Sequence, residues 1–189
     1  MNILALDPSS TAIGWAYHVK SSPPLAGGTL CESGVFRPPD VADRLDTTLT
    51  WLNDWLDAAI SDCIPGVIAY EDSSAVMARN QMRGARQMEN TALIRLVAGR
   101  HGVPLVRYAP NGIKKYATGN GHATKRQMVD ACNRTFGLSL SEADHDQADA
   151  IWIMDMAIND VPGMDQNMAA RKAKKKRAQS RKKKEPRLF

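Results

Sequence analysis

Two short apolar segments of the chain each end at an acidic residue: ILAL is followed by Asp7, and VIAY is followed by Glu71. Apolar runs of this length, bounded by polar or turn-forming residues, are typical of buried β-strands. A carboxylate that closes such a strand lies at the carboxyl edge of a sheet. The chain is therefore expected to fold around a sheet that carries acidic side chains at one edge.

A third acidic segment, DHDQADAIWIM, places Asp146 and Asp149 at the start of an apolar helical pattern. Because these residues are three positions apart, they share one face of the helix and lie near the positive end of its dipole. Four carboxylates that converge would repel one another strongly unless a cation were bound. Hard oxygen ligands are what magnesium and manganese require, so the four acids together predict the divalent-metal site of a nuclease.

Each acidic residue also has a simpler interpretation when it is taken alone. An Asp at a strand end is more often a turn or cap residue, the same holds for an isolated Glu, and Asp146 alone is a common helix-start residue. The histidines are dispersed, and only His145, beside Asp146, is a candidate for a catalytic or ligand role. The joint pattern of the acids and their order along the chain favour the metal-site hypothesis.

The order of these motifs resembles that of the RuvC family of Holliday-junction resolvases, which have an RNase H-like fold. The resemblance extends from Met1 to about Asn159. It includes a strand-one Asp that is followed by a small-residue turn and a second strand with Gly, here DPSSTAIGWAY. It also includes a carboxylate that closes the central strand, here Glu71, and a final helix that opens with a DxxDA pattern, here DQADA. The chain is thereby similar to a crossover junction endodeoxyribonuclease, of a bacterial or a phage type.

A fourth motif of the resemblance lies in IKKYATGNGHATKRQMV, which has a basic residue before a Gly-x-Gly turn and a second Lys eleven positions later. The residues concerned are Lys114, Gly119, Gly121 and Lys125. The glycines allow a tight turn close to a phosphate, and the residues from Ala123 onward are typical of a helix start. Taken alone, the pattern describes a surface loop with two lysines, whereas the spacing matched to the family assigns both lysines to the site.

The resemblance implies hydrolysis of DNA phosphodiesters with two metal ions per active site, magnesium or substituting manganese. Asp7 would bridge both ions, with Glu71 on one side and the two Asp residues of the final helix on the other. Lys125 and Lys114 would assist electrostatically. The implied products are 5′ phosphate and 3′ hydroxyl ends. A homodimer, with two sites related by a two-fold axis, would cut the symmetric strands of a four-way junction.

The segment after Glu71 departs from the family, which commonly places an aromatic wedge there. This chain has DSSAV instead, so the segment offers no ring for base stacking. Its first residue, Asp72, is interpreted either as a solvated neighbour of the site or as a modifier of metal binding. The departure leaves open a nuclease that also cuts flaps, forks and other branched DNA. Two further alternatives are an RNase H-like enzyme for RNA/DNA hybrids and a branched-DNA-binding protein without catalysis.

Periodicity along the chain predicts an α/β architecture. Three sequential strands at the start form an antiparallel meander, and the apolar pattern at residues 41–63 predicts a crossover helix on the sheet. VIAYE forms the next strand, residues 77–100 a long helix, and VPLVRYAP another strand. Helices near residues 124–136 and 146–158 complete the prediction, a mixed five-stranded, RNase H-like sheet that is flanked by helices.

The long predicted helix carries Arg79, Arg83 and Arg86, which are three or four positions apart and can lie along one helical face. Beside the acidic site, such a basic ridge could follow a DNA backbone; the alternative is a solvated outer face. The apolar residues of the same segment are expected in the core or in contact with a second subunit, and they are Met82, Met88, Leu93, Leu96 and Val97.

Charge divides the chain into two parts. Residues 171–189 contain eleven Lys and Arg against one Glu, a net charge of +10, and since the whole chain carries +5, the part before Arg171 carries −5. We expect a nuclease domain of residues 1–160 and a flexible Lys/Arg-rich tail of residues 161–189, which repels itself into disorder when free. Phosphate binding by the tail would depend steeply on salt, and solubility or targeting are the alternatives. The candidate DNA-binding residues of the tail are Lys174, Lys175 and Lys176.

Composition is consistent with a compact intracellular enzyme, because 189 residues with 43% hydrophobic content suffice for one domain with a core. Cys31, Cys63 and Cys132 form no CxxC motif or Cys/His cluster and are expected to be inert thiols. No signal peptide precedes MNILALD, and no apolar run approaches the ~20 residues of a membrane helix. We expect a soluble protein in the cytoplasm of a bacterial or phage-infected cell.

Overall fold

The computed structural model of the protein describes residues 1–19, 32–38, 45–72 and 81–160. Within this part of the chain, five strands form one sheet in the order β3-β2-β1-β4-β5. The bounds of the strands are β1 Ile3–Pro8, β2 Ile13–His18, β3 Glu32–Phe36, β4 Val67–Glu71 and β5 Leu105–Tyr108. The predicted five-stranded α/β fold is confirmed.

The sheet is mixed, because β1, β2 and β3 form the predicted antiparallel meander whereas β4 and β5 run parallel to β1. The middle strand is β1, so the prediction that the strand ending at Glu71 is central is corrected: β4 lies beside the middle strand. The meander extends the sheet on one side of β1, and the parallel strands extend it on the other. All six residues of β1 and the first four residues of β4 are buried, as expected for inner strands.

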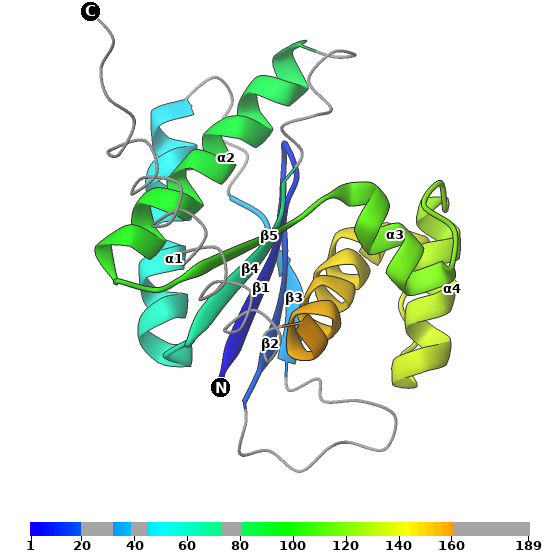
Figure 1. Cartoon of the computed structure of the whole chain (residues 1–189). Coiled ribbons are helices and arrows are strands. Elements are labelled where there is room, and N and C mark those ends of the chain that lie inside the picture. Colours follow the sequence, from blue (N-terminus) through cyan, green and yellow to red (C-terminus); the bar gives the residue numbers. More distant parts are fainter. Residues whose placement is uncertain (20–31, 39–44, 73–80, 161–189) are drawn as a thin grey trace, which may run out of the picture. The chain divides into compact units, whose positions relative to one another are not determined.

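Helices cover both faces of the sheet (Figure 1). α1 and α2 lie on one face, and α3, α4 and the helix of residues 145–160 lie on the other. The bounds of the labelled helices are α1 Leu45–Cys63, α2 Gln81–Arg100, α3 Pro110–Thr118 and α4 Lys125–Phe136. A short 3₁₀ helix, Glu142–Asp144, precedes the last helix.

The alternation of side chains along each strand decides which residues meet which helices. Leu4 and Leu6 of β1 and Tyr70 of β4 belong to the core that α1 and α2 cover. The buried helix residues of that core are Leu52, Leu56, Ile60, Ile94, Val97 and Ala98. Asp7 and Glu71 each follow one of these strand residues directly, so their side chains are on the opposite face.

The helix of residues 145–160 is buried on that opposite face. Ile151, Ile153 and Met154 are inaccessible to solvent. The Nε1 atom of Trp152 donates a hydrogen bond of 3.3 Å to the backbone oxygen of Met128 in α4. The Trp152 ring also packs edge-on against the ring of Phe136 at the end of α4. Burial and this contact with α4 hold the helix that carries two of the predicted acids.

α3 was not among the helices predicted from periodicity, in which this segment belonged to a loop before the Gly-x-Gly turn. It forms a helix because Pro110 suits the first helical turn, and because Gly119, with φ of 79°, can end the helix in the left-handed conformation. α4 begins after Thr124, whose side chain accepts from the backbone N–H of Gln127 while the Gln127 side chain accepts from the N–H of Thr124. These two helix ends define the turn between the predicted lysines.

Two compact units divide the chain, Met1–Ala157 and Ile158–Phe189, and only residues 158–160 of the second unit are described. The predicted tail, the DSSAV segment after its first residue, and the predicted beginnings of the first two helices lie outside the described residues. In the described part of the chain, no helix has the length and apolar character needed to cross a membrane.

Candidate functional site

The carboxyl ends of β1 and β4 place two predicted site residues side by side. The strands are parallel with Leu6 opposite Tyr70, so the residues that follow, Asp7 and Glu71, are neighbours at the edge of the sheet. Asp7 is only 7% exposed, and Glu71 is half-buried. Both side chains are on the face of the helix of residues 145–160, because Leu6 and Tyr70 face the core under α1 and α2.

The helix of residues 145–160 adds Asp146 and Asp149 to this edge. Burial raises the pKa of Asp7 well above its usual range, and the charges of the other three carboxylates raise it further. Burial also raises the pKa of Asp149 to about 7, with added contributions from Glu71 and Asp146. Since Asp7 interacts with the other three carboxyls, and Asp149 interacts with Glu71 and Asp146 as well, the structure brings the four predicted acids into one electrostatic group, which we name the carboxylate cluster.

The carboxylate cluster has the donor chemistry of a magnesium or manganese site. It presents hard oxygen atoms, and the Oδ1 atom of Asp149 is shielded from solvent with no hydrogen-bond partner in the described structure. As the side chains stand, no three Asp, Glu, His or Cys residues of the described part are arranged to hold a metal ion. Ionised carboxylates that lie close together repel one another, and a bound cation or bound protons relieve this repulsion. Cation binding would therefore draw the side chains together and release protons.

Lys125 and Lys114 border the carboxylate cluster from α4 and α3. Against the dominant effect of burial, the charge of Lys125 lowers the pKa values of Asp7 and Asp149, and the charge of Lys114 lowers that of Asp149. Lys125 is the exposed first residue of α4, and Lys114 is half-buried in α3. The two lysines, eleven positions apart, thus lie within electrostatic reach of the same acids.

His145 connects Lys125 to the carboxylate cluster. Its Nε2 atom contacts the Nζ atom of Lys125 and lies 3.2 Å from Oδ1 of Asp146. Its Nδ1 atom lies 3.2 Å from the backbone oxygen of Glu142. Sequence reasoning singled out His145 only because it precedes Asp146. The contact with Lys125 joins two different helices, so no local sequence signal could have indicated it.

Asp72 follows Glu71 in the chain but lies on the opposite face of the sheet. Its Oδ2 atom accepts a hydrogen bond of 3.0 Å from Nη1 of Arg107 and lies 3.7 Å from Nη2 of Arg95. Only 10% of its side chain is exposed, so the interpretation of Asp72 as a solvated neighbour of the site is wrong. We name these three residues the Asp72 ion cluster; it joins β4 and β5 to α2.

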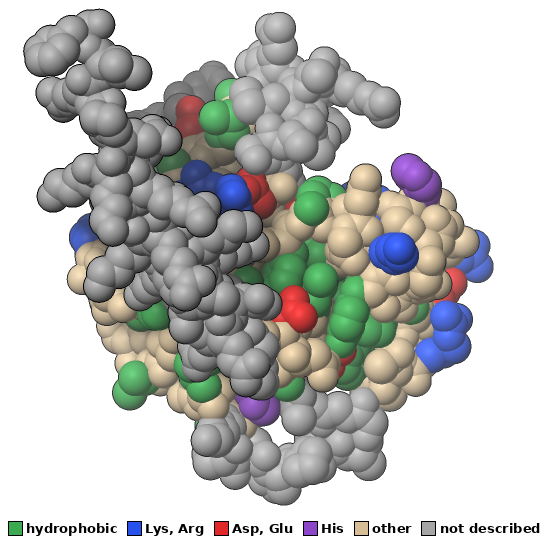
Figure 2. All heavy atoms as spheres, in the orientation of Figure 1, with side chains coloured by type: hydrophobic (Ala, Val, Ile, Leu, Met, Phe, Trp, Pro, Cys, Tyr) green, Lys and Arg blue, Asp and Glu red, His purple; other side chains and the backbone are tan. Residues whose placement is uncertain are grey.

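The predicted DNA-binding residues are only partly covered by the structure. Arg86 is exposed on α2, where it is free of the core. Arg79 and the side chains of Arg83 and Met82 lie outside the described residues, as do the three tail lysines. On the side of α3 and α4, the space-filling view shows separate Lys and Arg side chains (Figure 2).

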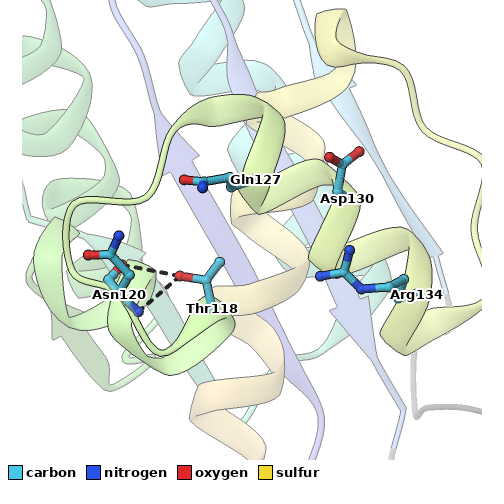
Figure 3. Close-up of a pocket in the computed structure, with 5 residues that line it drawn as sticks. All are labelled: Thr118, Asn120, Gln127, Asp130 and Arg134. Carbon is cyan, nitrogen blue, oxygen red and sulfur yellow. Dashed lines mark hydrogen bonds between the residues drawn. The ribbon is translucent and has the colours of Figure 1, made fainter.

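A hollow of about 310 Å³ lies between the end of α3 and α4 (Figure 3). The lining residues are Thr118, Asn120, Gln127, Asp130 and Arg134. The Oγ1 atom of Thr118 accepts a hydrogen bond of 3.1 Å from the backbone N–H of Asn120 and so stabilises the turn. The six predicted catalytic residues are not among those that line the hollow, which is therefore distinct from the carboxylate cluster.

The described cysteines are inert in character, as expected. Burial raises the pKa of the Cys132 thiol to about 12 and that of the Cys63 thiol to about 11. Both thiols are free and stay protonated near neutral pH, which disfavours nucleophilic chemistry. Cys31 lies outside the described residues.

Residues 3–158 match the model of the family described as crossover junction endodeoxyribonuclease RuvC. Curated relatives include the RuvC of Rickettsia conorii, which is 28% identical over 153 residues, or 81% of this chain and 94% of the relative. The RuvC of Anaeromyxobacter dehalogenans is 32% identical over 160 residues, or 83% of this chain and 81% of the relative. The span that matches the family contains the whole carboxylate cluster and both lysines.

Solved structures with a similar fold include Thermus thermophilus RuvC, with a TM-score of 0.65 at 19% identity over 81% of this chain and 90% of that one. The same protein in complex with a Holliday junction substrate gives a TM-score of 0.66 at the same identity and coverage. The yeast mitochondrial Holliday junction resolvase Ydc2 gives 0.55 at 12% identity over 80% of this chain and 75% of that one. These likenesses establish the fold.

Proposed function

This chain belongs to the RuvC family of crossover junction endodeoxyribonucleases, and on that premise we propose that it resolves four-way DNA junctions by paired hydrolysis of phosphodiester bonds. The observation that carries the proposal is the carboxylate cluster, in which burial raises the pKa values of Asp7 and Asp149. Such a cluster opposes folding unless a cation compensates it, and phosphodiester hydrolysis is a reaction that metal ions promote. The structure of a family member with a Holliday junction substrate supports this choice of substrate.

The family consists of metal-dependent nucleases, and for this chain we propose two magnesium ions per site, with manganese as a substitute. The residues that would hold them are Asp7, Glu71, Asp146 and Asp149. Bound ions would supply a water of lowered pKa for in-line attack and would neutralise the leaving 3′ oxygen. The unpartnered Oδ1 atom of Asp149 supports this assignment, because a cation would provide the interaction that this buried oxygen lacks.

The side chains of the site position the reacting groups. Asp7 is the best candidate for a ligand shared by both ions, because it is the most buried of the four acids and interacts with each of the others. Lys125 stabilises the negative charge that develops on the scissile phosphate, and Lys114 assists from α3. His145 contacts the Lys125 amine and limits the positions it can take. The products are a 5′ phosphate and a 3′ hydroxyl, which a ligase can join.

An exposed apolar stripe on α2 supports the proposal of a homodimer. Met88 and Leu96 are 45% and 59% exposed, and Ala92, halfway between them, is exposed as well. Val97 is buried in the core and Leu93 packs against it. Large apolar side chains on the outer face of a helix favour contact with another protein surface, and a second copy would supply the second nick of a symmetric substrate.

The dimer proposal is tested by placing a charge in this stripe. Leu96→Asp is expected to give a monomer in sedimentation at concentrations where the wild type is a dimer, and to make single nicks in place of paired ones. Ala58→Asp, at an exposed position of α1, is the matched control and should leave the oligomeric state unchanged. A dimeric Leu96→Asp variant that makes paired nicks would contradict the proposal.

We also propose that Arg86 and the basic tail contact the phosphate backbone of the substrate. Because the part of the chain before Arg171 carries a net charge of −5, the tail supplies the long-range attraction for DNA that the body lacks. Removal of the residues after Met168 should weaken junction binding and flatten its dependence on salt, since fewer counterions are then released. Equal salt slopes for the full and truncated chains would contradict this role.

A broader branched-DNA endonuclease, which also cuts flaps and forks, is the second candidate. The observation that favours it is the DSSAV segment, which lacks the aromatic wedge that is common after the central Glu of the family. The ratio of cleavage rates on a four-way junction, a fork and a flap distinguishes the two candidates. In either case we propose that the protein acts in the cytoplasm, where bacterial or phage DNA is accessible.

The experiment that tests the proposed function compares the wild type with Asp7→Asn on a labelled four-way junction and on a matched linear duplex, with magnesium and with chelator. We expect paired nicks that occur only on the junction, require metal and disappear in the variant. Binding without cuts in any metal would favour the non-catalytic alternative. Equal cleavage of an RNA/DNA hybrid would favour the RNase H-like alternative.

A further inference from the structure

We propose that Gly14 is a positioning residue of the active site: it sets how closely the helix of residues 145–160 approaches the sheet, and thereby where Asp146 and Asp149 lie relative to Asp7. The inference rests on the proposed function for its catalytic meaning, because it concerns the same carboxylates. The geometry that supports it is independent of any bound metal.

Gly14 lies directly opposite Asp7 in the antiparallel pairing of β1 and β2. Residues paired in this way direct their side chains to the same face of the sheet. A side chain at position 14 would therefore project beside Asp7. The preceding residue, Ile13, faces the other side, where it is part of the core under α1 and α2.

The backbone of the last helix occupies the space that a side chain at position 14 would need. A Cβ atom on Gly14 would lie 1.9 Å from the carbonyl oxygen of Asp146, 2.4 Å from its carbonyl carbon and 3.1 Å from the amide nitrogen of Gln147. Backbone atoms in the first turn of a buried helix cannot swing aside as the end of a side chain can. To restore an ordinary van der Waals separation, the helix would have to move by roughly 1–2 Å.

Gly14 is needed for space and not for its backbone angles. In the described part of the chain, glycines with a left-handed φ occur at positions 102, 119 and 137, and Gly14 is not one of them. Alanine could adopt the extended conformation of β2 without strain. The absence of a Cβ atom is therefore what allows the peptide between Asp146 and Gln147 to lie against the strand.

A second contact holds the same helical turn along the sheet. The Nε2 atom of Gln147 donates a hydrogen bond of 2.9 Å to Oγ of Ser33 in β3. Two consecutive residues of the turn thus contact two adjacent strands, the backbone of Asp146 on β2 and the side chain of Gln147 on β3. Gly14 sets the distance of the turn from the sheet, and Ser33 fixes its place across the strands.

The carboxylate cluster is divided between two structural elements, the last helix and the sheet. Asp146 and Asp149 move with the last helix, whereas Asp7 and Glu71 are fixed by the sheet. A helix shift that relieves the contact at position 14 would move one pair of carboxylates away from the other. It would therefore weaken the binding of any metal ion that needs ligands from both pairs. Misplacement of catalytic groups by about 1 Å can lower a rate by roughly 100-fold.

The test substitutes Gly14→Ala, with Gly34→Ala in β3 as the matched control. A Cβ atom on Gly34 meets ring atoms of Trp15 at 3.0–3.1 Å and not the last helix. Crystal structures of the metal-free proteins give the first readout. In Gly14→Ala the helix of residues 145–160 is expected to shift away from β2 far enough to accommodate the new methyl group, and in Gly34→Ala it should not move. An unshifted helix in Gly14→Ala overturns the proposal, whether or not the protein cleaves DNA.

Manganese binding, measured by calorimetry without DNA, and junction cleavage at increasing metal concentration give the second readout. Gly14→Ala should weaken manganese binding by about tenfold or more and cleavage by about 100-fold. Gly34→Ala should change each by less than about threefold, even where its thermal stability falls equally. Equal losses in the two variants would leave Gly14 with a merely structural role. A wild type that binds manganese without cutting junctions would contradict the proposed function, while the two binding curves would still decide the role of Gly14.

Asp149→Glu provides an internal check, because its additional methylene extends the carboxylate by about 1.5 Å. In the wild-type background this change should lower cleavage, and in the Gly14→Ala background it should restore part of the loss. A further loss in both backgrounds would overturn the proposal. If Gly14→Ala does not fold, Gln147→Ala replaces it. Gln147→Ala and Ser33→Ala should then weaken manganese binding equally, and the double variant no more than either; additive losses would overturn the proposal.

Discussion

Glu71 and Asp72 are consecutive acids that end on opposite faces of the sheet and in opposite electrostatic surroundings. The charge of Glu71 raises the pKa values of Asp7 and Asp149, and only burial raises them more. Asp72 is paired with Arg107 at 3.0 Å and with Arg95 at 3.7 Å. The period of two along a strand is sufficient to cause this difference. Proximity to a site in the sequence therefore does not make a residue part of it.

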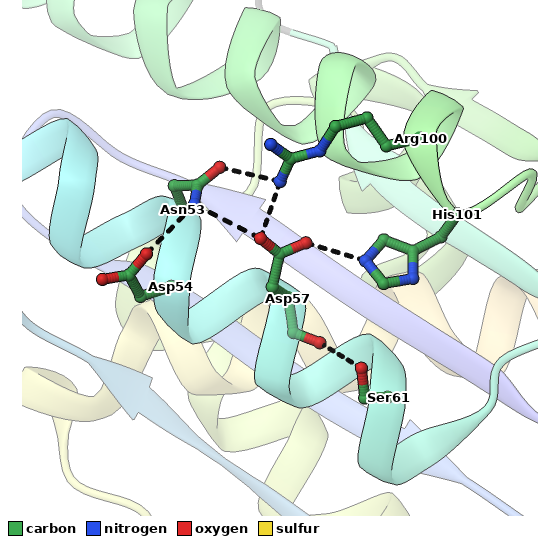
Figure 4. Close-up of polar contacts among 6 residues, drawn as sticks. All are labelled: Asn53, Asp54, Asp57, Ser61, Arg100 and His101. Carbon is green, nitrogen blue, oxygen red and sulfur yellow. Dashed lines mark hydrogen bonds and ion pairs between the residues drawn. The ribbon is translucent and has the colours of Figure 1, made fainter.

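A third acid, Asp57 of α1, resembles Asp72 and sharpens the comparison. Its carboxylate lies 2.7 Å from Nε2 of His101 and 2.7 Å from Nη2 of Arg100 (Figure 4). Hydrogen bonds from His101 and then from Arg100 lower its pKa, in contrast to the raised values in the carboxylate cluster. Asp72 and Asp57, which join structural elements, are paired with nearby basic side chains, whereas burial and mutual repulsion outweigh the nearby lysines in the carboxylate cluster, and that imbalance favours an external cation.

The largest expected effect is a difference in junction cleavage between variants of Glu71 and of Asp72. Glu71→Gln keeps the size of the side chain but removes a charge from the carboxylate cluster, so junction cleavage should fall by about 10³-fold, equivalent to roughly 4 kcal/mol of transition-state stabilisation. Asp72→Asn should change cleavage by less than about fivefold. Single-turnover rates on a four-way junction at saturating magnesium measure both. Similar losses in the two variants would remove the distinction between the two faces.

The second prediction concerns stability without metal. In the folded protein Asp149 has a pKa of about 7, compared with 3.8 for an ordinary Asp. Between those pH values the folded state holds a proton that the unfolded state has released, so stability falls as pH rises from about 4 to 7 and stays low above that range. Asp149→Asn cannot ionise. In chelator at pH 8, the free energy of unfolding of this variant should exceed that of the wild type by roughly 2–4 kcal/mol.

The control for this prediction is again Asp72→Asn, which removes a compensated charge. It should lower the free energy of unfolding by about 1 kcal/mol, because two arginines lose a partner. Urea unfolding at pH 5 and pH 8 measures both variants. The gain in unfolding free energy from Asp149→Asn should be about half as large at pH 5 as at pH 8, because pH 5 lies between the two pKa values. A variant that is equally destabilised at both pH values would show that ionisation of Asp149 does not oppose folding.

The third prediction compares how the two clusters respond to metal. A cation that binds only the folded state stabilises it by about 1.4 kcal/mol at ten times its dissociation constant. Manganese should therefore raise the melting temperature of the wild type and of Asp72→Asn by the same amount. Glu71→Gln should show little of this increase. Thermal unfolding followed by circular dichroism, with and without manganese, gives the answer, and a full response in Glu71→Gln would count against its role as a ligand.

The fold was predictable from the sequence wherever a local pattern carries the information. The apolar runs before Asp7 and Glu71 became strands, and the apolar pattern from Asp146 onward became the last helix. α3 was missed because it is only nine residues long and its clearest signals were assigned to other features, Pro110 to the end of the strand VPLVRYAP and Gly119 to the Gly-x-Gly turn. The position of β4 beside the middle strand depends on pairing between distant segments, which no local pattern specifies.

The grouping of the four acids was predictable from the sequence, but the contacts around them were not. The order of the four acids along the chain sufficed to group them, because the ends of parallel strands meet at one edge of a sheet. The partners of Asp72 are on α2 and β5, and the contact between Gly14 and Asp146 joins β2 to the last helix. Such contacts are set by tertiary packing, and a single sequence contains no spacing that reveals them.

The smallest expected effect is a difference in stability between variants of the two arginines in the Asp72 ion cluster. The Arg107 side chain is 69% exposed, so its pair with Asp72 is screened by solvent, and Arg107→Ala should cost less than about 0.5 kcal/mol of stability. Arg95→Ala should cost more, because Arg95 also donates a hydrogen bond of 2.9 Å to the hydroxyl of Tyr70 and lies over its ring. Urea unfolding at low salt and at about 1 M salt measures both costs, and the cost of Arg107→Ala should vanish at high salt. If Arg107→Ala lowered the free energy of unfolding by more than roughly 1 kcal/mol at both salt concentrations, Arg107 and not Arg95 would be the main partner of Asp72.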